Sequence, residues 1–109
     1  MPEEKELKTY TPVEVISKLS QELPNWQYQE GYIVREFQTE NWKETVFLAN
    51  AIAYLAEVYW HHPNLELSFK KLKVKLKTHE VDGITDRDFN LAKEIERLAQ
   101  KPHENIQTG

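Results

Sequence analysis

Three of the four histidines stand beside the ends of predicted helices or strands, where their imidazoles could transfer protons. His61 and His62 are adjacent, His79 follows a strand-like segment, and His103 lies near the C-terminus. An imidazole gives and takes protons near neutral pH, because its ordinary pKa is close to neutrality. Two or three imidazoles gathered from such ends would form a general acid–base site. The competing interpretation is that the adjacent pair only caps a surface helix.

A metal centre is the second kind of site that these residues would allow. His61, His62 and His79, with Glu57 or Asp88, are ligand types that zinc accepts. Adjacent helical residues point about 100° apart, however, and adjacent strand residues point to opposite faces, so a His-His pair chelates poorly. Cysteine is absent, and no HExxH spacing occurs. The residue pattern therefore favours acid–base chemistry over a metal centre.

Four lysines alternate with apolar residues and form a possible anion-binding surface. Lys71, Lys73, Lys75 and Lys77 would share one face of a strand. Such a row either is a solvated sheet face or binds nucleic acid. The formal net charge of −4 and the lack of interleaved aromatic residues favour the solvated face. We expect no nucleic-acid partner.

Three helices are predicted to position these groups. The first covers residues 11–22, where Thr11 and Glu14 form a capping box and Pro12 occupies the first turn. The second begins at Asn41 and ends near residue 61, before Pro63. Its apolar positions form a wide face, which predicts that it is the central core helix. The third begins at Thr85 and ends before residue 102.

Four strands separate these helices in two pairs. Segments 26–28 and 32–37 alternate around Glu30-Gly31 and predict a hairpin. Segments 65–69 and 71–78 predict a second pair, because residues 71–78 alternate strictly between lysine and apolar or threonine residues. The order αββαββα predicts an α+β fold of two layers, an antiparallel four-stranded sheet with three helices on one face.

Composition limits the class of protein further. The chain has 109 residues, of which 39% are hydrophobic and 29% charged, as expected for a single domain over residues 1–109. We expect frayed ends at about 1–8 and 102–109. The N-terminus lacks the basic and apolar order of a secretory signal, and no apolar run is long enough for a membrane helix. A cytoplasmic protein with no membrane partner is expected.

A spaced series of residues resembles the signature of the pterin-4a-carbinolamine dehydratase family. The series is Glu57, His61-His62-Pro63, Phe69, His79 and Asp88, and it continues through Gly83-Ile84-Thr85 and Asp88-Phe89-Asn90-Leu91-Ala92. The similarity is dense from residue 57 to about residue 96 and looser elsewhere. The αββαββα order also matches a domain of this family.

The resemblance implies a reaction on a pterin. The substrate would be a 4a-hydroxytetrahydropterin, formed when an aromatic amino acid hydroxylase uses tetrahydropterin and oxygen. The enzyme would eliminate water to give a quinonoid dihydropterin, with no metal or organic cofactor. Such a hydro-lyase would therefore be linked functionally to a hydroxylase.

The resemblance also assigns roles by position. His61 and His79 would be the acid and base, in an order left open, and His62 would bind and orient the pterin. Glu57 would orient His61 or touch the ligand, and Asp88 would hold His79 in one tautomer. Pro63, Thr78 and Trp60 complete the expected substrate-binding set with His62 and His79, while Phe69 is expected to pack in the core.

Departures from the animal members leave an alternative open. Leu65 replaces a tryptophan, Lys70 an asparagine, and Trp60 an acidic residue before the histidines. A binding or assembly module of the same fold, holding a pterin or a protein without turnover, is therefore the second hypothesis. Family members form homodimers or homotetramers, which the resemblance implies here as well.

Overall fold

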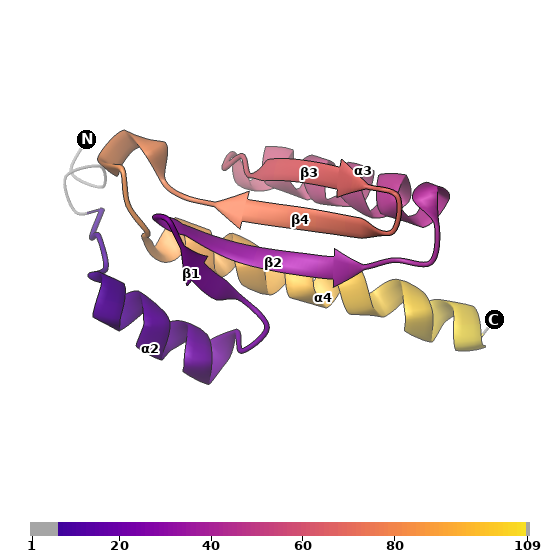
Figure 1. Ribbon diagram of the computed structural model, residues 1–109, viewed down its shortest axis with the longest axis horizontal. Coiled ribbons are helices and arrows are strands. Elements are labelled where there is room, and N and C mark those ends of the chain that lie inside the picture. Colours follow the sequence, from indigo (N-terminus) through magenta and orange to yellow (C-terminus); the bar gives the residue numbers. More distant parts are fainter. Residues whose placement is uncertain (1–6, 109) are drawn as a thin grey trace.

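The predicted element order is confirmed in the computed structural model, which describes the backbone of residues 7–108 and the side chains of residues 7–100. Two β hairpins are inserted between three helices (Figure 1). One short element was not anticipated, the 3₁₀ turn η1 at His79–Val81. The complete order is α2 (Pro12–Glu22), β1 (Gln27–Gln29), β2 (Tyr32–Gln38), α3 (Trp42–Tyr59), β3 (Asn64–Ser68), β4 (Lys71–Leu76), η1 and α4 (Asp86–Thr108).

The four strands form one antiparallel sheet in the order β1-β2-β4-β3. Glu30 and Gly31 both have positive φ, 51° and 87°, as a two-residue hairpin turn requires. In the central pair, Ile33 lies opposite Leu76 and Phe37 opposite Leu72. These side chains face the helices, and α3 and α4 lie behind the strands in Figure 1. The α+β architecture with helices on one face is therefore confirmed.

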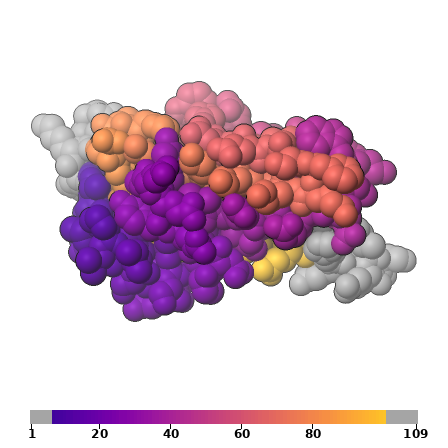
Figure 2. All heavy atoms as spheres, viewed as in Figure 1, coloured from indigo at the N-terminus to yellow at the C-terminus, as the bar shows by residue number. Residues whose placement is uncertain are grey.

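The opposite face of the sheet carries the lysine row. Burial alternates along β4, so that the lysines face outward while Leu72, Val74 and Leu76 are buried. Lys73 lies 3.8 Å from Glu36 on β2 and 4.0 Å from Glu66 on β3, which places it in a ladder of opposite charges. The prediction that the lysines share the outward face of the strand is confirmed. Figure 2 shows this face, on which the strand side chains cover the helices behind.

Helix α3 is not the central core helix that its wide apolar face predicts. Its inner side buries Ala49, Ile52 and Ala56, but Phe47 and Tyr54 are 64% and 73% exposed. The physical reason is its position, because α3 packs on β3, β4 and α4 at one margin of the sheet, leaving its outer side uncovered. The fully buried helical positions Phe89, Leu91, Ala92 and Ile95 belong to α4.

Helix α4 extends further than predicted. It continues to Thr108, so the expected end before Pro102 is wrong. A proline removes the hydrogen bond of its own N–H group, and the backbone here remains helical beyond that position. Residues 1–6 and 109, where part of the expected fraying falls, lie outside the described residues. Within residues 7–108, no helix is long and apolar enough to span a bilayer.

A buried ion pair joins α4 to the inner face of the sheet. Glu96 of α4 accepts hydrogen bonds from Arg35 Nε at 2.5 Å and from Trp26 Nε1 at 2.8 Å. The side chains of Arg35 and Glu96 are only 19% and 15% exposed. Each charge therefore depends on the other for the interactions that water would otherwise provide.

Replacing one member of this pair is expected to destabilise the fold strongly. Glu96→Ala should lower the free energy of unfolding by about 3 kcal/mol, because it leaves Arg35 unpaired beneath the sheet. Urea denaturation measures this, with Glu94→Ala as a control expected to stay within about 0.5 kcal/mol. The double variant Arg35→Met/Glu96→Ala should lose less free energy of unfolding than the sum of the losses in the two single variants, because it leaves neither charge unpaired. Strict additivity would contradict the coupling.

Candidate active site

Helix α3 ends in a left-handed turn directly before the two adjacent histidines. Trp60 has φ 53° and ψ 47°, and its N–H group donates to the carbonyl of Glu57. The N–H group of His61 donates to the carbonyl of Ala56 at 3.0 Å, which completes a Schellman motif. The chain therefore reverses immediately before the two histidines. His61 is 7% exposed, whereas His62 is exposed.

His61 binds a buried carboxylate from the start of α4. Its Nε2 atom lies 2.6 Å from Oδ1 of Asp88, whose side chain is fully buried. The expectation that Asp88 holds His79 is therefore wrong, because Asp88 is bonded to His61. The spacing of residues in the sequence could not reveal that His61 and Asp88 pair, because the pairing depends on the packing of α4 against α3.

The second oxygen of Asp88 is bound from two other positions. Oδ2 accepts from the Thr78 hydroxyl at 2.8 Å and from the Thr85 N–H group at 2.9 Å. The two threonine hydroxyls are 2.8 Å apart, and all three residues are fully buried. Asp88 thus joins the end of α3, the residue after β4 and the start of α4.

His62 has a separate carboxylate partner on the surface. Its Nε2 atom lies 3.1 Å from Oε1 of Glu57, and both side chains are more than half exposed. The Trp60 ring meets the His62 ring edge-on, with centroids 5.0 Å apart. Glu57 therefore contacts His62, whereas the sequence suggested His61. The Trp60 residue is 71% exposed.

His79 opens η1 directly after the buried Thr78, and its side chain is exposed. Both His79 and His61 lie near enough to the neighbouring Glu80 for their charges to affect its pKa. A hydrogen bond from its own backbone N–H group is the main cause that lowers the pKa of Glu80, and the charges of Arg87, His61 and His79 lower it further. The structure therefore brings His61 and His79 into electrostatic range of one carboxylate.

The remaining predicted residues have different surroundings. Pro63 is half-buried after the histidine pair. Phe69 is 64% exposed at the β3–β4 turn, so the expectation that it packs in the core is wrong. It lies in the tight turn between the edge strand β3 and the central strand β4, where its ring is exposed. Leu65 is partly buried and packs against the core.

Thr85 is a site residue that sequence reasoning did not assign. A signal was present, because Thr85 precedes Asp88 by three positions at a helix start, the spacing of a capping box. In the structure, the Asp88 side chain accepts from the Thr85 N–H group, as the second half of such a box requires. The cap therefore also places the carboxylate that binds His61.

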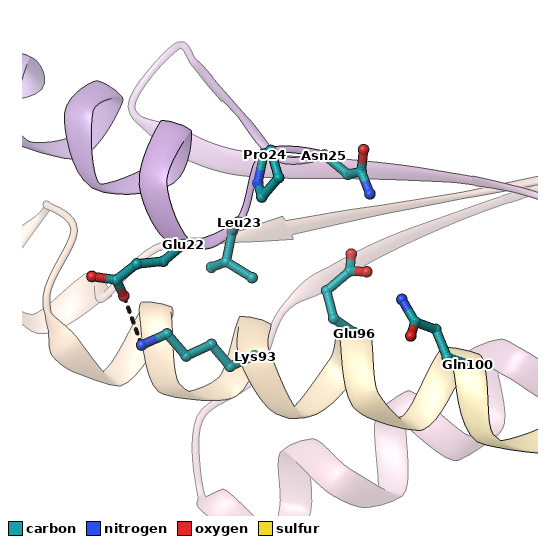
Figure 3. Close-up of a pocket in the computed structure, with 7 residues that line it drawn as sticks. All are labelled: Glu22, Leu23, Pro24, Asn25, Lys93, Glu96 and Gln100. Carbon is teal, nitrogen blue, oxygen red and sulfur yellow. Dashed lines mark ion pairs between the residues drawn. The ribbon is translucent and has the colours of Figure 1, made fainter.

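Other parts of the surface offer different chemistry. Among the described residues, no group of three histidine, aspartate or glutamate side chains has the arrangement of metal ligands. A cleft of about 310 Å³ lies between the end of α2 and α4, as Figure 3 shows. There Lys93 pairs with Glu22 at 2.7 Å, and hydrogen bonds from Lys93 and then from Lys18 lower the pKa of Glu22. This cleft is lined by Glu22, Leu23, Pro24, Asn25, Lys93, Glu96 and Gln100.

Imidazoles from two element ends, one of them bound to a buried carboxylate, are groups that acid–base chemistry can use. Comparison with known proteins gives the family. The model of the family described as pterin 4 alpha carbinolamine dehydratase matches residues 8–98. The chain therefore belongs to the pterin-4a-carbinolamine dehydratase family, as its motif resemblance indicated.

Curated relatives agree with this membership. A protein of Aquifex aeolicus (strain VF5), named “Putative pterin-4-alpha-carbinolamine dehydratase”, is 53% identical, with 80% of this chain and 96% of the relative covered. A protein of Thermomicrobium roseum with the same name is 38% identical, covering 77% and 90%.

Two solved structures share the fold. The crystal structure of a transcriptional coactivator/pterin dehydratase from Brucella melitensis has a TM-score of 0.76 at 24% identity, covering 84% of this chain and 99% of that one. A pterin dehydratase-like protein identified as a RuBisCO assembly factor in the alpha-carboxysome has a TM-score of 0.57 at 18% identity, covering 69% and 87%. At these identities the two structures show a common fold.

The left-handed turn at Trp60 gives a direct test of the site's local geometry. A residue with a Cβ atom costs roughly 1–2 kcal/mol in this conformation, whereas glycine adopts it freely. The free energy of unfolding of the Trp60→Gly variant should therefore be about 1 kcal/mol higher than that of the Trp60→Ala variant. Urea denaturation measures this difference. Both variants remove the contact with the His62 ring, so their difference isolates the backbone. Equal stabilities would show that the turn is not left-handed in solution.

Proposed function

We propose that this protein catalyses the dehydration of a 4a-hydroxytetrahydropterin to a quinonoid dihydropterin. Family membership supports the substrate class and the reaction. The observation that carries the mechanism is the buried pair of His61 and Asp88, which Thr78 connects to the chain position beside His79. In this proposal one imidazole is bound to the buried carboxylate and the other follows Thr78 in the chain.

The reaction needs two proton transfers, which suit this pair of imidazoles. The bond between C4a and the hydroxyl oxygen breaks, and the leaving oxygen takes a proton to become water. A ring nitrogen gives up its proton, and its electron pair forms the new double bond to C4a. General acid–base catalysis requires one group at each position, within hydrogen-bond reach. His61 and His79 perform these two steps in the proposed mechanism.

The exposed residues around these two histidines would bind the substrate. His62, bonded to Glu57, would hydrogen-bond the pterin, and the exposed Trp60 ring would offer a surface for the flat heterocycle. Pro63 holds the chain after the pair, and backbone groups of His79 would meet the polar edge of the pterin. The expected backbone contact from Thr78 is wrong, because its N–H group donates to Gly83 and its carbonyl accepts from Val81 and Gly83. The reaction needs no metal or organic cofactor in this proposal, and it recycles tetrahydropterin for an aromatic amino acid hydroxylase in the cytoplasm.

Removing either proposed acid–base group should reduce turnover. His61→Ala and His79→Ala are each expected to lower the dehydration rate by roughly 10²-fold or more, the usual contribution of such a group. Stopped-flow measurement with 4a-hydroxytetrahydropterin checks this, and prior dialysis against EDTA should leave the wild-type rate unchanged. His103→Ala, which replaces a histidine outside the proposed site, is the matched control.

Two outcomes would contradict parts of the proposal. Full activity in folded His61→Ala and His79→Ala proteins would remove these residues from the mechanism. A wild-type rate no higher than that of buffer, together with binding of an oxidised pterin, would favour the alternative of a non-catalytic binding or assembly module. Trp60 and Leu65, which depart from the family pattern, motivate that alternative.

The outer side of α3 supports a proposal about self-association as a homodimer or homotetramer. Phe47, Tyr54 and Val58 recur at helical spacing and are 64%, 73% and 60% exposed. Three large apolar side chains on one exposed stripe are typical of an interface between proteins. Because this helix is otherwise packed on the sheet, the stripe is held rigidly for contact with a second copy.

A charge on this stripe should shift the assembly toward smaller species. Tyr54→Lys places an ammonium group among apolar side chains and is expected to lower the sedimentation coefficient at a fixed protein concentration. Ala53→Lys adds the same charge to an exposed position on another side of α3 and should leave the sedimentation coefficient unchanged. If wild type and Tyr54→Lys sediment alike, the stripe is not an interface.

A further inference from the structure

The hydrogen bonds around Asp88 have a direction that can be deduced from atom types. The Thr78 hydroxyl donates its only proton to Oδ2 of Asp88 at 2.8 Å. Towards the Thr85 hydroxyl, Thr78 must then accept, so Thr85 is the donor in that 2.8 Å contact. The Thr85 oxygen in turn accepts from the N–H group of Arg87 at 3.2 Å. Every donor in this series of hydrogen bonds therefore points towards Asp88.

This direction also determines how Asp88 meets His61. Oδ2 already accepts two donors, one of which is the Thr85 backbone N–H group and cannot become an acceptor. A buried carboxylate surrounded by donors is stabilised as the anion, and the 2.6 Å contact with Nε2 of His61 is then a charge-assisted bond. Nε2 must carry the proton in this bond. The neutral ring therefore has its lone pair on Nδ1.

The second nitrogen of His61 is available for chemistry. Nδ1 makes no hydrogen bond to residues 7–100, and no buried side-chain nitrogen in that part of the chain lacks a partner. The His61 side chain is 8% exposed, so Nδ1 lies on the edge of the ring that solvent reaches. The buried network thus leaves one defined nitrogen facing outward.

We propose that Thr85, Thr78 and Asp88 form an oriented hydrogen-bond chain that holds His61 as the Nε2–H tautomer, so that Nδ1 is the nitrogen that exchanges a proton with the substrate. The role of Nδ1 rests on the proposed dehydratase function, whereas the tautomer does not. Thr85 and Thr78 are positioning residues, because they act on His61 through Asp88.

Asparagine at position 88 should reverse this tautomer. In Asp88→Asn, the amide oxygen must occupy the place of Oδ2, because the Thr85 N–H group can only donate. The amide NH₂ group then faces Nε2 of His61, which has to accept. The ring proton should therefore move to Nδ1, and Nδ1 should lose the lone pair that faces solvent.

Nitrogen NMR measures the tautomer directly. Two-bond ¹H–¹⁵N correlation spectra of protein labelled with ¹⁵N-histidine distinguish the protonated ring nitrogen from the bare one, at a pH where the rings are neutral. His62→Gln, His79→Gln and His103→Gln spectra identify the other three histidines and so assign the His61 signals. We expect a bare Nδ1 in wild type and a bare Nε2 in Asp88→Asn. Asp86→Asn, at an exposed carboxylate in the same helical turn, should keep the wild-type pattern.

Kinetics on the same proteins test the role of Nδ1. Asp88→Asn should lower kcat by at least about 10²-fold with little change in KM, as a wrong tautomer does in the serine protease triad. Thr78→Val, which removes one donor to the carboxylate, should lower kcat roughly tenfold, and Thr78→Ser should restore it.

The outcomes separate the two proposals. A wild-type His61 with its proton on Nδ1 overturns the oriented chain, even if Asp88→Asn fails to fold. The expected tautomer with an undiminished kcat in Asp88→Asn overturns the role of Nδ1. A bare Nδ1 in a protein with no dehydratase activity refutes the proposed function but leaves the oriented chain standing.

Discussion

The buried carboxylate of Asp88 is the group on which the geometry of the site depends. It is fully buried, and it bonds to His61 after α3, to Thr78 after β4 and to the Thr85 backbone at the start of α4. A carboxylate removed from water needs such partners, because an unpaired buried charge costs several kcal/mol. The same requirement fixes the relative positions of three chain segments. The hydrogen bonds that stabilise the Asp88 carboxylate therefore also position the imidazole of His61.

The adjacent histidines have different environments after the backbone reverses at Trp60. Trp60 adopts a left-handed conformation that is costly for a residue with a Cβ atom. Conformational strain of this kind persists where surrounding contacts determine it, here the Schellman hydrogen bonds and the pairing of His61 with Asp88. The turn directs His61 inward and leaves His62 beside Glu57 at the surface. Two neighbouring residues of one type can thus serve as an acid–base group and a binding group.

Local patterns in the sequence were sufficient for the elements, whereas the contacts between elements were not. The capping box at Thr11, the hairpin turn at Glu30-Gly31 and the alternation in β4 depend on near neighbours, and all three were predicted correctly. The partner of Asp88 depends on how α4 packs against the end of α3, which no local spacing encodes. The position of α3 was mispredicted for the same reason. An apolar stripe indicates that a helix face is covered, but it does not indicate whether the same chain or another protein covers it.

The position of the site at the ends of the elements follows from backbone hydrogen bonding. Within the sheet and the helices, N–H and C=O groups are already paired, so they are not available to a buried side chain. Beyond the end of β4, strand pairing is reduced to an isolated bridge between Thr78 and Gly83. At the start of α4, the first N–H groups have no partner within the helix. The Thr85 N–H group is one such donor, and Asp88 accepts from it. A buried charge is most readily stabilised where strand and helix ends leave donors unpaired, and His61 is bound to that charge.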